Sequence, residues 1–390
     1  MNASQRARRR ERRRSAREQA RREALSPALD FDAIFSFRAL IDSSTTCQRG
    51  VAWKVRVQSF TLTRTYQVAR LASELAAGEY RKSPAVHFVL NERGCKRDIS
   101  GVGFRDRVVQ RTLCDNSMVP VLCRGIIDDN SASLKGRGMD RARRRFAQQM
   151  VEAHRRWGDD AVCVQYDFRS YFASIDSSRA AREIEAVYAG ITDDARIPAV
   201  IREIVTEERG VGLGNQTSQT CAIWYPSRID HHIREVLRLG LSGRYMDDGY
   251  IFCRACDATA VIESVSRQAE SLGLRLHERK TKATPLSKPL TFLKVVFKLD
   301  GCMVSNAIVE RSLRRTIRHI GAVRGLLRKG RIDEAGYIQS VASTYGNILR
   351  YGSPKQRRRF EASIPEEYRW KLKEIRIRQC NVPKAKRKTR

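Results

Sequence analysis

Residues 162–176 read VCVQYDFRSYFASID, and residues 244–253 read RYMDDGYIFC. The first stretch opens with apolar, β-prone residues that indicate a strand, and Asp167 stands near the end of this run. The second stretch has two β-prone arms around Asp-Asp-Gly, a pattern typical of a hairpin with Asp247 and Asp248 at its turn. The two stretches therefore predict β-strands that carry acidic side chains at their ends.

Carboxylates in these positions suggest chemistry on phosphate groups. Joining two nucleotides requires a 3′ hydroxyl to attack a phosphorus that bears several negative charges, and two divalent cations about 3.5–4 Å apart can assist the attacking and leaving oxygens. Such cations need hard oxygen ligands, so the carboxylates must converge. Taken singly, each acid also fits an ordinary turn or cap. Taken together, Asp167, Asp247 and Asp248 predict a site for two Mg²⁺ ions, with Mn²⁺ as an alternative metal.

The charge of the chain predicts a polyanionic partner. Its 390 residues are 42% hydrophobic, enough for two or three linked subdomains, and 75 Lys+Arg against 43 Asp+Glu give a net charge of +32. An anionic membrane is disfavoured, because no apolar run approaches the roughly 20 residues that span a bilayer. Nucleic acid is the expected partner. The start MNASQRARRRERRR lacks the apolar stretch of a secretory signal, so we expect a cytoplasmic protein.

The cysteines give a weak signal. Of the ten, only Cys253 and Cys256 form a C-x-x-C pair, and no second pair stands at the spacing of a zinc site. The pair could form a redox or metal site, but the pattern favours reduced thiols at the end of a strand and in the next turn.

The remaining patterns predict mostly helices. A strand-turn-strand is expected over 87–100 with its turn at Gly94, and a Gly-rich loop over 210–214. Beyond Gly301 the chain is expected to be helical and very basic. Helices before that point are predicted from apolar periodicity over residues 63–80, 104–123 (ending near Pro120), 178–190, 218–237 and 258–273.

Several segments, in this order, resemble the prokaryotic reverse transcriptases, the family of group II intron, retron, diversity-generating retroelement and unclassified phage-defence enzymes. YMDD at 245–248 is similar to the family's Y-x-D-D metal motif, and YDFRSYFASID resembles its first metal-binding strand. GVGLGNQTSQ at 210–219 resembles the loop and helix start that cradle template and incoming nucleotide. FRDRVVQRTLC and DDNSASLKGRGMDRA (128–142) resemble fingers motifs, and LGLRLHERKT and TFLKVVF resemble later palm segments. The likeness runs from about residue 35 to 300.

The resemblance implies an α+β fold, a right-hand polymerase with fingers, an antiparallel-sheet palm and a helical thumb. The implied domains are a basic N-terminal arm (1–30), fingers with the start of the palm (31–160), the palm with a fingers insertion (161–300), the thumb (301–365) and a basic C-terminal tail (366–390).

Roles at the reacting centre follow from the same resemblance. Asp167 and Asp247 match metal ligands, Asp248 matches the flanking acid, and the backbone carbonyl of Phe168 matches a further metal contact. Phe172 stands where the family places a steric gate, a ring that would collide with a ribose 2′-OH; core packing is its alternative reading.

Other positions match contacts to the nucleotide. Lys96 and Arg97 match fingers cations that neutralise the triphosphate, and Lys280 matches a candidate general acid for the pyrophosphate; each could instead be a surface charge. Gly214 allows close backbone approach, while Ser218 and Gln219 are polar contacts nearby. Ser218 could otherwise be a helix N-cap.

The sequence departs from the family in two places. Relatives often have Pro at the position of Gly212, and their later palm segment usually reads F-L-G where this chain has Phe292-Leu293-Lys294. The metal positions are unaffected, but template handling and primer grip are placed in doubt. Tyr345, Tyr351 and Trp370 could stack on bases, although core packing is favoured. Expected phosphate contacts in the thumb are Arg314, Arg315, Arg318, Arg324, Arg328 and Lys329.

The resemblance therefore predicts an RNA-directed DNA polymerase that adds dNTPs on an RNA template and yields DNA, with a structured noncoding RNA as template or scaffold. A role in antiphage defence is favoured, because residues 48–58 and NSASLKGRGMD look like the phage-defence members. The alternatives are a diversity-generating retroelement enzyme, an RNA-templated RNA polymerase or untemplated transferase, and an RNA-binding scaffold with dispensable polymerase activity.

Overall fold

The computed structural model describes residues 15, 16, 19, 20, 23–92, 95–208, 210–301 and 303–380. Within these ranges it leaves out the side chains at 92, 95–97, 373 and 375–380. Most of the predicted basic arm (1–30) and the last ten residues of the predicted tail (366–390) therefore lie outside the described residues.

The described residues form a mixed α+β structure that is mostly helical, with small antiparallel sheets, as the sequence predicts. The sheets have the strand orders β1-β2, β4-β5-β3-β6 and β7-β8-β9. Their strands are β1 (Val86–Glu92), β2 (Cys95–Gly101), β3 (Ala161–Tyr166), β4 (Ser242–Tyr245), β5 (Asp248–Arg254), β6 (Lys282–Pro285), β7 (Leu290–Phe292), β8 (Val295–Asp300) and β9 (Met303–Ile308).

The chain divides into two compact units. Unit 1 comprises Met1–Gly138, Tyr166–Gly249 and Val261–Thr281, and unit 2 comprises Met139–Gln165, Tyr250–Ala260 and Lys282–Arg390.

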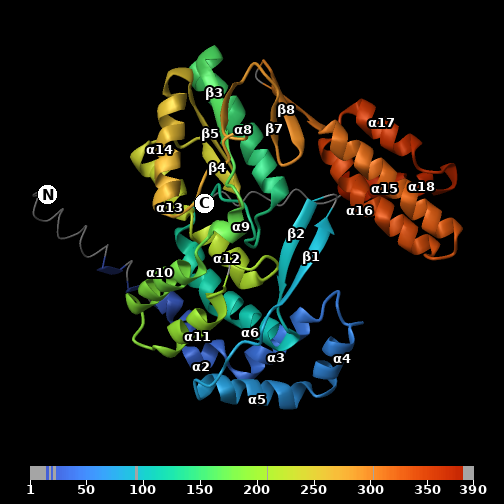
Figure 1. The fold of residues 1–390 in the computed structure, drawn as a ribbon. Helices are drawn as coiled ribbons and strands as arrows, with labels where there is room; N and C mark the ends of the chain where they lie inside the picture. The colour runs from blue at the N-terminus through green and yellow to red at the C-terminus, as the bar shows by residue number, and fades with distance from the viewer. Residues whose placement is uncertain are drawn as a thin grey trace, which may run out of the picture. The chain divides into compact units, whose positions relative to one another are not determined.

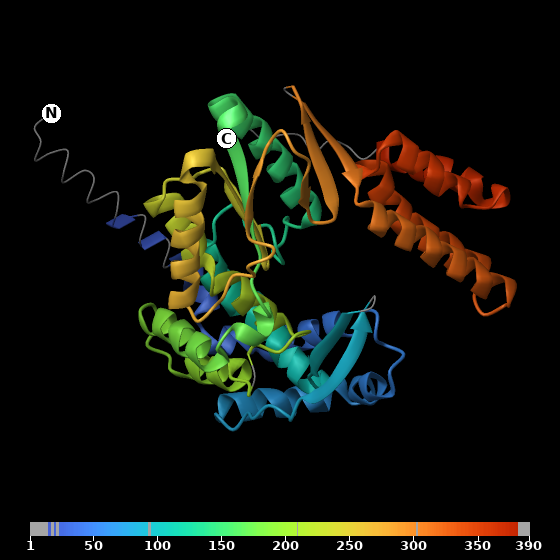
Figure 2. The ribbon, with the colours of Figure 1, turned by 45° about the horizontal axis from the view of Figure 1, so that its top comes forward.

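Unit 1 contains a group of packed helices and the β1-β2 hairpin. Helix α3 packs on α5 and α6, as both ribbon views show (Figures 1 and 2). On α5, the buried Val68, Leu71 and Leu75 recur at helical spacing. The strands of the hairpin pair in antiparallel register from Val86 with Gly101 to Glu92 with Cys95, as predicted. The helices are α2 (Phe31–Ile34), α3 (Phe37–Cys47), α4 (Val55–Leu62), α5 (Arg64–Ala76), α6 (Phe104–Leu113), α7 (Val119–Leu122), α9 (Tyr171–Ser174), α10 (Ser177–Ala189), α11 (Arg196–Val205), α12 (Gln216–Trp224) and α13 (Ser227–His231), followed by α14 (Ala258–Ser271), most of which belongs to this unit.

One predicted helix is broken. The sequence predicts a single helix over 218–237, but α12 ends at Trp224 and α13 begins at Ser227. Pro226 precedes α13, and its ring cannot donate the backbone hydrogen bond that a continuous helix needs. By contrast, Pro120 lies in the first turn of α7, where a missing N–H is tolerated.

Unit 2 is built around an aromatic cluster on α8 (Met139–Trp157). The ring of Phe146 stacks on Phe292 with centroids 4.9 Å apart, and it also contacts Tyr250, Phe252 and Phe297. These aromatic residues come from four elements, so their burial fixes α8 against β5, β7 and β8.

The β7-β8 turn places two non-glycine residues in a conformation that favours glycine. Leu293 and Lys294 are its two central residues, and both have positive φ, +47° and +66°. Glycine adopts this conformation without strain, whereas Leu and Lys must be held in it by their surroundings. Here the Leu293 carbonyl accepts hydrogen bonds from the buried Arg143 at 2.6 and 3.2 Å.

The C-terminal helices differ from the prediction at their start. Residues 303–308 form strand β9 rather than helix. They pair with β8 in antiparallel register, from Met303 opposite Asp300 to Ile308 opposite Val295. Tyr345 and Tyr351 are buried in the helical bundle, so base stacking by them is wrong and core packing is right, whereas Trp370 is exposed. The helices are α15 (Glu310–Arg328), α16 (Glu334–Tyr351), α17 (Pro354–Ala362) and α18 (Glu366–Cys380).

Of the helices in the described part of the chain, none has both the length and the apolar character needed to cross a bilayer.

Candidate functional site

Two strand ends bring the predicted acids together. Asp167 directly follows β3, and Asp248 is the first residue of β5. The ring of Tyr166 lies against Gly249, where even a Cβ atom would overlap the ring. Only glycine therefore lets the end of β3 approach the start of β5 this closely, which explains the Asp-Asp-Gly order in physical terms.

The hairpin turns earlier than its sequence pattern suggests. The two residues between β4 and β5 are Met246 and Asp247, so Asp248 belongs to a strand and not to the turn. Met246 has φ +56°, the left-handed conformation typical of hairpin turns. The side chains of Tyr245 and Met246 pack against the buried cluster that contains Ile126 and Ile223, and this packing fixes the turn.

The carboxyl group of Asp248 interacts directly with that of Asp167. Burial, together with the negative charges of Asp247 and Asp167 and a hydrogen bond to Asp167, raises the pKa of Asp248 to about 7, although Lys280 lowers it. Near neutral pH the carboxyl group of Asp248 can therefore carry a proton and donate a hydrogen bond to Asp167.

Lys280 supplies the positive charge at this site. Its Nζ lies 2.9 Å from Oδ2 of Asp167. Burial lowers the pKa of Lys280, but the hydrogen bond and charge of Asp167, with the charges of Asp248 and Asp247, outweigh burial and raise it. Backbone hydrogen bonds place the lysine, because His277 N donates to Asp167 O at 2.7 Å and Lys280 N donates to His277 O at 3.0 Å.

The donor atoms at this site suit a hard divalent cation. Carboxylate oxygens are the ligands that Mg²⁺ prefers, and a cation would replace the proton on Asp248 and compete with Lys280. Within the ranges that the structure describes, no group of three or more His, Cys, Asp or Glu side chains is arranged so that it could hold a metal ion. The direct contact is between Asp167 and Asp248, while Asp247 acts through its charge.

A buried arginine next to the site was missed by the sequence analysis. Arg244 is 1% exposed, and its guanidinium donates to both carboxylate oxygens of Asp230 at 2.7–3.1 Å. It also donates to the carbonyl of Met246 at 2.9 Å and to the hydroxyl of Tyr171 at 3.3 Å. The arginine thus joins the acidic turn to the segment after Asp167. A sequence signal existed, because a charged residue interrupts the predicted strand directly before YMDD.

The DDNS segment extends this network. Asn130 pairs with Arg244 as a parallel β-bridge, and its side chain donates to Asp230 at 3.4 Å. Asp129 accepts a hydrogen bond from Arg234 at 2.6 Å. The segment that resembles a fingers motif therefore runs beside β4 and helps to hold Asp230.

The Gly-rich loop lies against the predicted steric gate. Val211 N donates to the carbonyl of Phe172 at 2.9 Å, and Ser100 N donates to the carbonyl of Leu213 at 3.3 Å. A Cβ at Gly210, which has φ +56°, would overlap the Phe172 carbonyl. The loop therefore connects the end of β2 with α9.

The aromatic residues after Asp167 point in different directions. Phe168 is buried and stacks on Tyr171 with centroids 5.3 Å apart. Tyr171 is also buried, with its hydroxyl donating to the carbonyl of Ala222. Phe172 is only half-buried, as a side chain must be if it is to contact a nucleotide.

The other predicted contacts are brought together less completely. Gly214, with φ +115°, lies beside Ile99 of β2, and Gln219 is exposed on α12. Ser218 is buried within α12 and is not its N-cap, since the helix begins at Gln216 after Asn215. Lys96 and Arg97 lie on β2, but their side chains are outside the described part of the structure.

Asn215 was also missed by the sequence analysis. This residue is buried beside Gly212, and within the described residues its Nδ2 has no hydrogen-bond partner. An unpaired buried donor in the Gly-rich loop is a candidate ligand contact.

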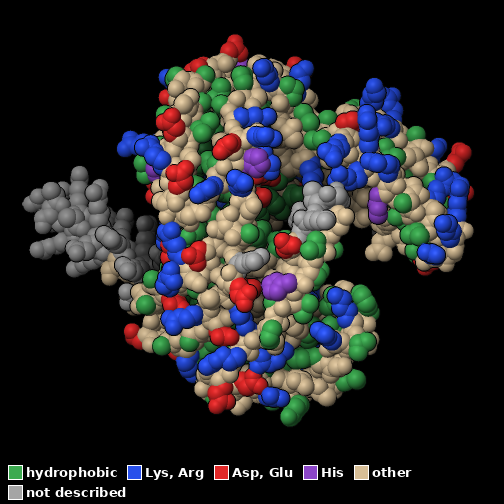
Figure 3. Space-filling view, viewed as in Figure 1, with side chains coloured by type: hydrophobic (Ala, Val, Ile, Leu, Met, Phe, Trp, Pro, Cys, Tyr) green, Lys and Arg blue, Asp and Glu red, His purple; other side chains and the backbone are tan. Residues whose placement is uncertain are grey.

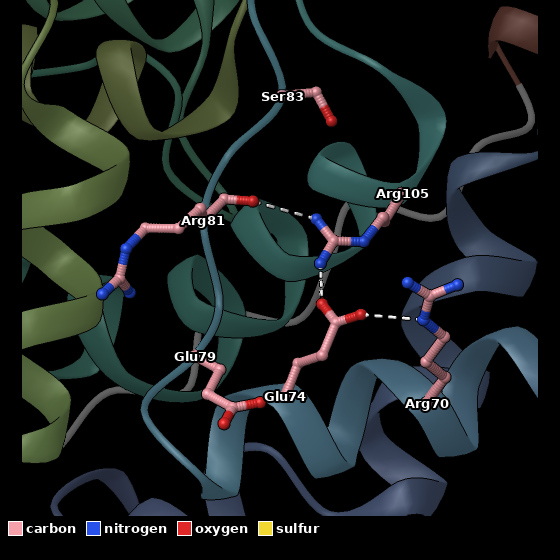
Figure 4. A pocket seen from close by; sticks show the side chains of 6 residues that line it. All are labelled: Arg70, Glu74, Glu79, Arg81, Ser83 and Arg105. Carbon is pink, nitrogen blue, oxygen red and sulfur yellow. Dashed lines mark hydrogen bonds and ion pairs between the residues drawn. The ribbon is translucent and has the colours of Figure 1, made fainter.

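Two further features do not join the acidic centre. A hollow of about 590 Å³ near the start of β1 is lined by the arginines Arg70, Arg81 and Arg105 (Figure 4). Arg70 and Arg105 both form ion pairs with Glu74, which also lines the hollow. Arg105 in addition donates a hydrogen bond to the carbonyl of Arg81. The remaining residues that line the hollow are Glu79 and Ser83.

Cys253 is buried in β5 and Cys256 is exposed in the next turn, the placement that the sequence favours.

No protein-family model matches this chain, and no curated protein matches it. The resemblance to reverse transcriptases consequently stays a prediction from the motifs.

Proposed function

We propose that this protein is an RNA-directed DNA polymerase of the prokaryotic reverse transcriptase type. The proposal is carried by one observation: Asp167 and Asp248, distant in sequence, meet at two strand ends beside Lys280. The order of the motifs and the net charge of +32 support the same function.

The roles of the residues follow from their positions. Asp167, Asp247 and Asp248, with the Phe168 carbonyl, would hold two Mg²⁺ ions. When bound, the ions supply positive charge against the phosphates and lower the pKa of the attacking 3′ hydroxyl. Lys280, which its carboxylate neighbours keep protonated, would donate a proton from Nζ to the departing pyrophosphate.

Replacement of the acids tests the reaction. Asp247→Asn with Asp248→Asn should lower Mg²⁺-dependent incorporation of dNTPs on a primed RNA template by at least about 10³-fold, since charge stabilisation is the main catalytic contribution here. Asp257→Asn, which changes an exposed acid, is the matched control. Equal incorporation by the two variants would remove the basis of the proposal.

Phe172 tests the choice of sugar. Phe172→Ala should raise ribonucleotide incorporation relative to deoxynucleotide incorporation by about tenfold or more, because the ring would no longer exclude a 2′-OH. Phe37→Ala, which trims an exposed phenylalanine of α3, is the control. An unchanged ratio would disprove the gate and favour an RNA-templated RNA polymerase or an untemplated transferase.

The biological role is proposed from the resemblance alone. We propose antiphage defence with a structured noncoding RNA, and a diversity-generating role is the alternative. Plaque counts on prokaryotic cells that express the wild type or the Asp247/Asp248 variant would separate enzyme from scaffold. Protection that survives loss of both acids would favour an RNA-binding scaffold.

A further inference from the structure

Helix α4 carries large apolar residues on two opposite faces. On one face Val57 and Phe60 are buried, and the ring of Phe60 contacts Phe104 of α6 with centroids 5.0 Å apart. On the other face Val55 and Leu62 are 75% and 86% exposed. Because they are seven residues apart, they share one stripe of the helix.

Two exposed aromatic residues flank this stripe. Trp53 is 74% exposed in the turn before α4, and Tyr66 is 66% exposed in the first turn of α5. Gln48, at the end of α3, contacts Thr61 near the end of α4 and accepts a hydrogen bond from Arg64 of α5 at 2.7 Å, so the junction of α4 and α5 is held at the end of α3. Figure 3 shows hydrophobic and basic side chains side by side over the region of α4.

The charged side chains of this surface are all basic. Between Asp42 and Glu74 the chain contains no acidic residue. Lys54 and Arg56 are exposed, and neither forms an ion pair with a carboxylate among the described residues. Lys54 lies 5.6 Å from the Trp53 ring centroid. Aromatic rings interleaved with cations match the chemistry of an unpaired polynucleotide, whose bases stack while its phosphates contact the cations.

We propose that the surface formed by Trp53, Lys54, Arg56 and Tyr66 binds single-stranded RNA without sequence preference. The choice of RNA over DNA rests on the proposed function, whereas the choice of a single-stranded polynucleotide rests on the rings and cations. None of these residues belongs to the acidic centre, so this surface adds an RNA contact to that made at the reacting end. A protein partner is disfavoured, because the aliphatic stripe is short and no acid is available to pair with basic partner residues.

Binding of labelled oligouridylate of about 20 nucleotides to the full-length protein, in EDTA and without nucleotides, tests this surface. Each of Trp53→Ala and Tyr66→Ala should weaken binding by about tenfold, whereas Trp53→Phe and Tyr66→Phe should bind like the wild type. Lys54→Gln with Arg56→Gln should reduce the slope of log affinity against log salt by about 0.7 for each cation. Val236→Ala, which trims another exposed apolar residue of unit 1, is the control.

A fluorescence measurement adds a direct test of stacking. Oligouridylate should quench part of the tryptophan emission of the wild type, and that part should be missing in Trp53→Phe although affinity is retained. Unchanged affinity in the Trp53→Ala, Tyr66→Ala double variant would overturn the proposal. So would tighter binding of oligothymidylate than of oligouridylate, which would indicate DNA.

Two further outcomes distinguish rival explanations. If Val55→Ser with Leu62→Ser changes the oligomeric state and leaves RNA binding intact while the aromatic variants have no effect, the face binds a second copy instead. If the acid variants polymerise like the wild type but RNA binding still depends on Trp53 and Tyr66, the proposed function fails and this surface stands.

Discussion

Asp230 and Asp248 both belong to unit 1, Asp230 as a buried and Asp248 as a half-buried residue, and their surroundings differ in charge. Asp230 accepts two-pronged hydrogen bonds from Arg244 and a further one from Asn130. Asp248 faces Asp167 and Asp247, and the nearby Lys280 pairs with Asp167 while remaining more than half exposed. The first carboxylate is neutralised by its own chain, and the second is not.

The difference shows how a structural ion pair and a reactive acidic centre can lie only a few residues apart in the sequence, at Arg244 and at Asp247 and Asp248. Burial lowers the pKa of Arg244, but the charge and hydrogen bond of Asp230 outweigh burial and raise the pKa overall. The pair therefore stays charged, and Arg244 fixes the turn by donating to the Met246 carbonyl. The pKa of Asp248, which this turn precedes, is raised, and a divalent cation could stabilise its ionised form. The neutralised pair thus positions the charged centre.

Removal of Arg244 should give the largest effect. Arg244→Met leaves Asp230 buried without its partner and should lower the free energy of unfolding by about 3–5 kcal/mol in urea titrations. Arg228→Met, which breaks an exposed pair with Glu183, should cost less than about 1 kcal/mol. Arg244→Met with Asp230→Leu should recover stability, but not polymerase activity, because the Met246 carbonyl stays unsupported. A small loss in the single variant would contradict the comparison.

Removal of the Asp248 charge should act in the opposite direction. In metal-free buffer at about pH 8, Asp248→Asn should raise the free energy of unfolding by about 1–3 kcal/mol. The pKa of Asp248 is raised, so ionisation costs stability. The gain should therefore be absent below about pH 4, grow as the pH rises to about 7, and then stay constant.

Divalent ions separate this prediction from a general stabilisation. Mg²⁺ should raise the melting temperature of the wild type more than that of Asp248→Asn. An equal rise in both proteins would mean that the cation acts elsewhere.

Lys280 should compete with a divalent cation. Lys280→Met removes the cation beside Asp167, and it should lower the half-saturating Mg²⁺ concentration about fivefold, which corresponds to about 1 kcal/mol. Polymerisation should nevertheless slow by about 10²-fold, because the proton donor is lost. Lys282→Met changes an exposed lysine of β6 and serves as control. A higher half-saturating Mg²⁺ concentration in Lys280→Met would show instead that the lysine assists cation binding.

The smallest effect is expected at the surface neighbour of Asp230. His231 pairs with Glu235 at 2.7 Å; burial lowers its pKa, but the hydrogen bonds to Glu235 and to the Gly125 carbonyl raise it overall. The pair should add at most about 0.5 kcal/mol below pH 6.5, and this contribution should disappear as the pH rises through the raised pKa. Comparing His231→Gln with the wild type at about pH 5.5 and 9 measures it, and Glu235→Gln should remove the same pH dependence.

Local patterns in the sequence predicted most elements. Two failures concern local signals that the prediction passed over: Pro226 divides the helix over 218–237, and residues 303–308 pair with the adjacent strand β8. Arg244 was not recognised because its partners Asp230, Ile223 and Tyr171 are close only in the fold. The spacing of apolar side chains predicts the secondary structure of one segment, and it does not reveal which segments meet in the fold.

The sequence by itself determined the mixed α+β class, the basic charge and the acids at strand ends, because these depend on composition and on neighbours along the chain. Tertiary structure alone decided which acids meet, which one is neutralised by Arg244, and which face of α4 stays exposed. Burial and charge pairing act through space, so residues far apart in the chain set the properties of each carboxylate.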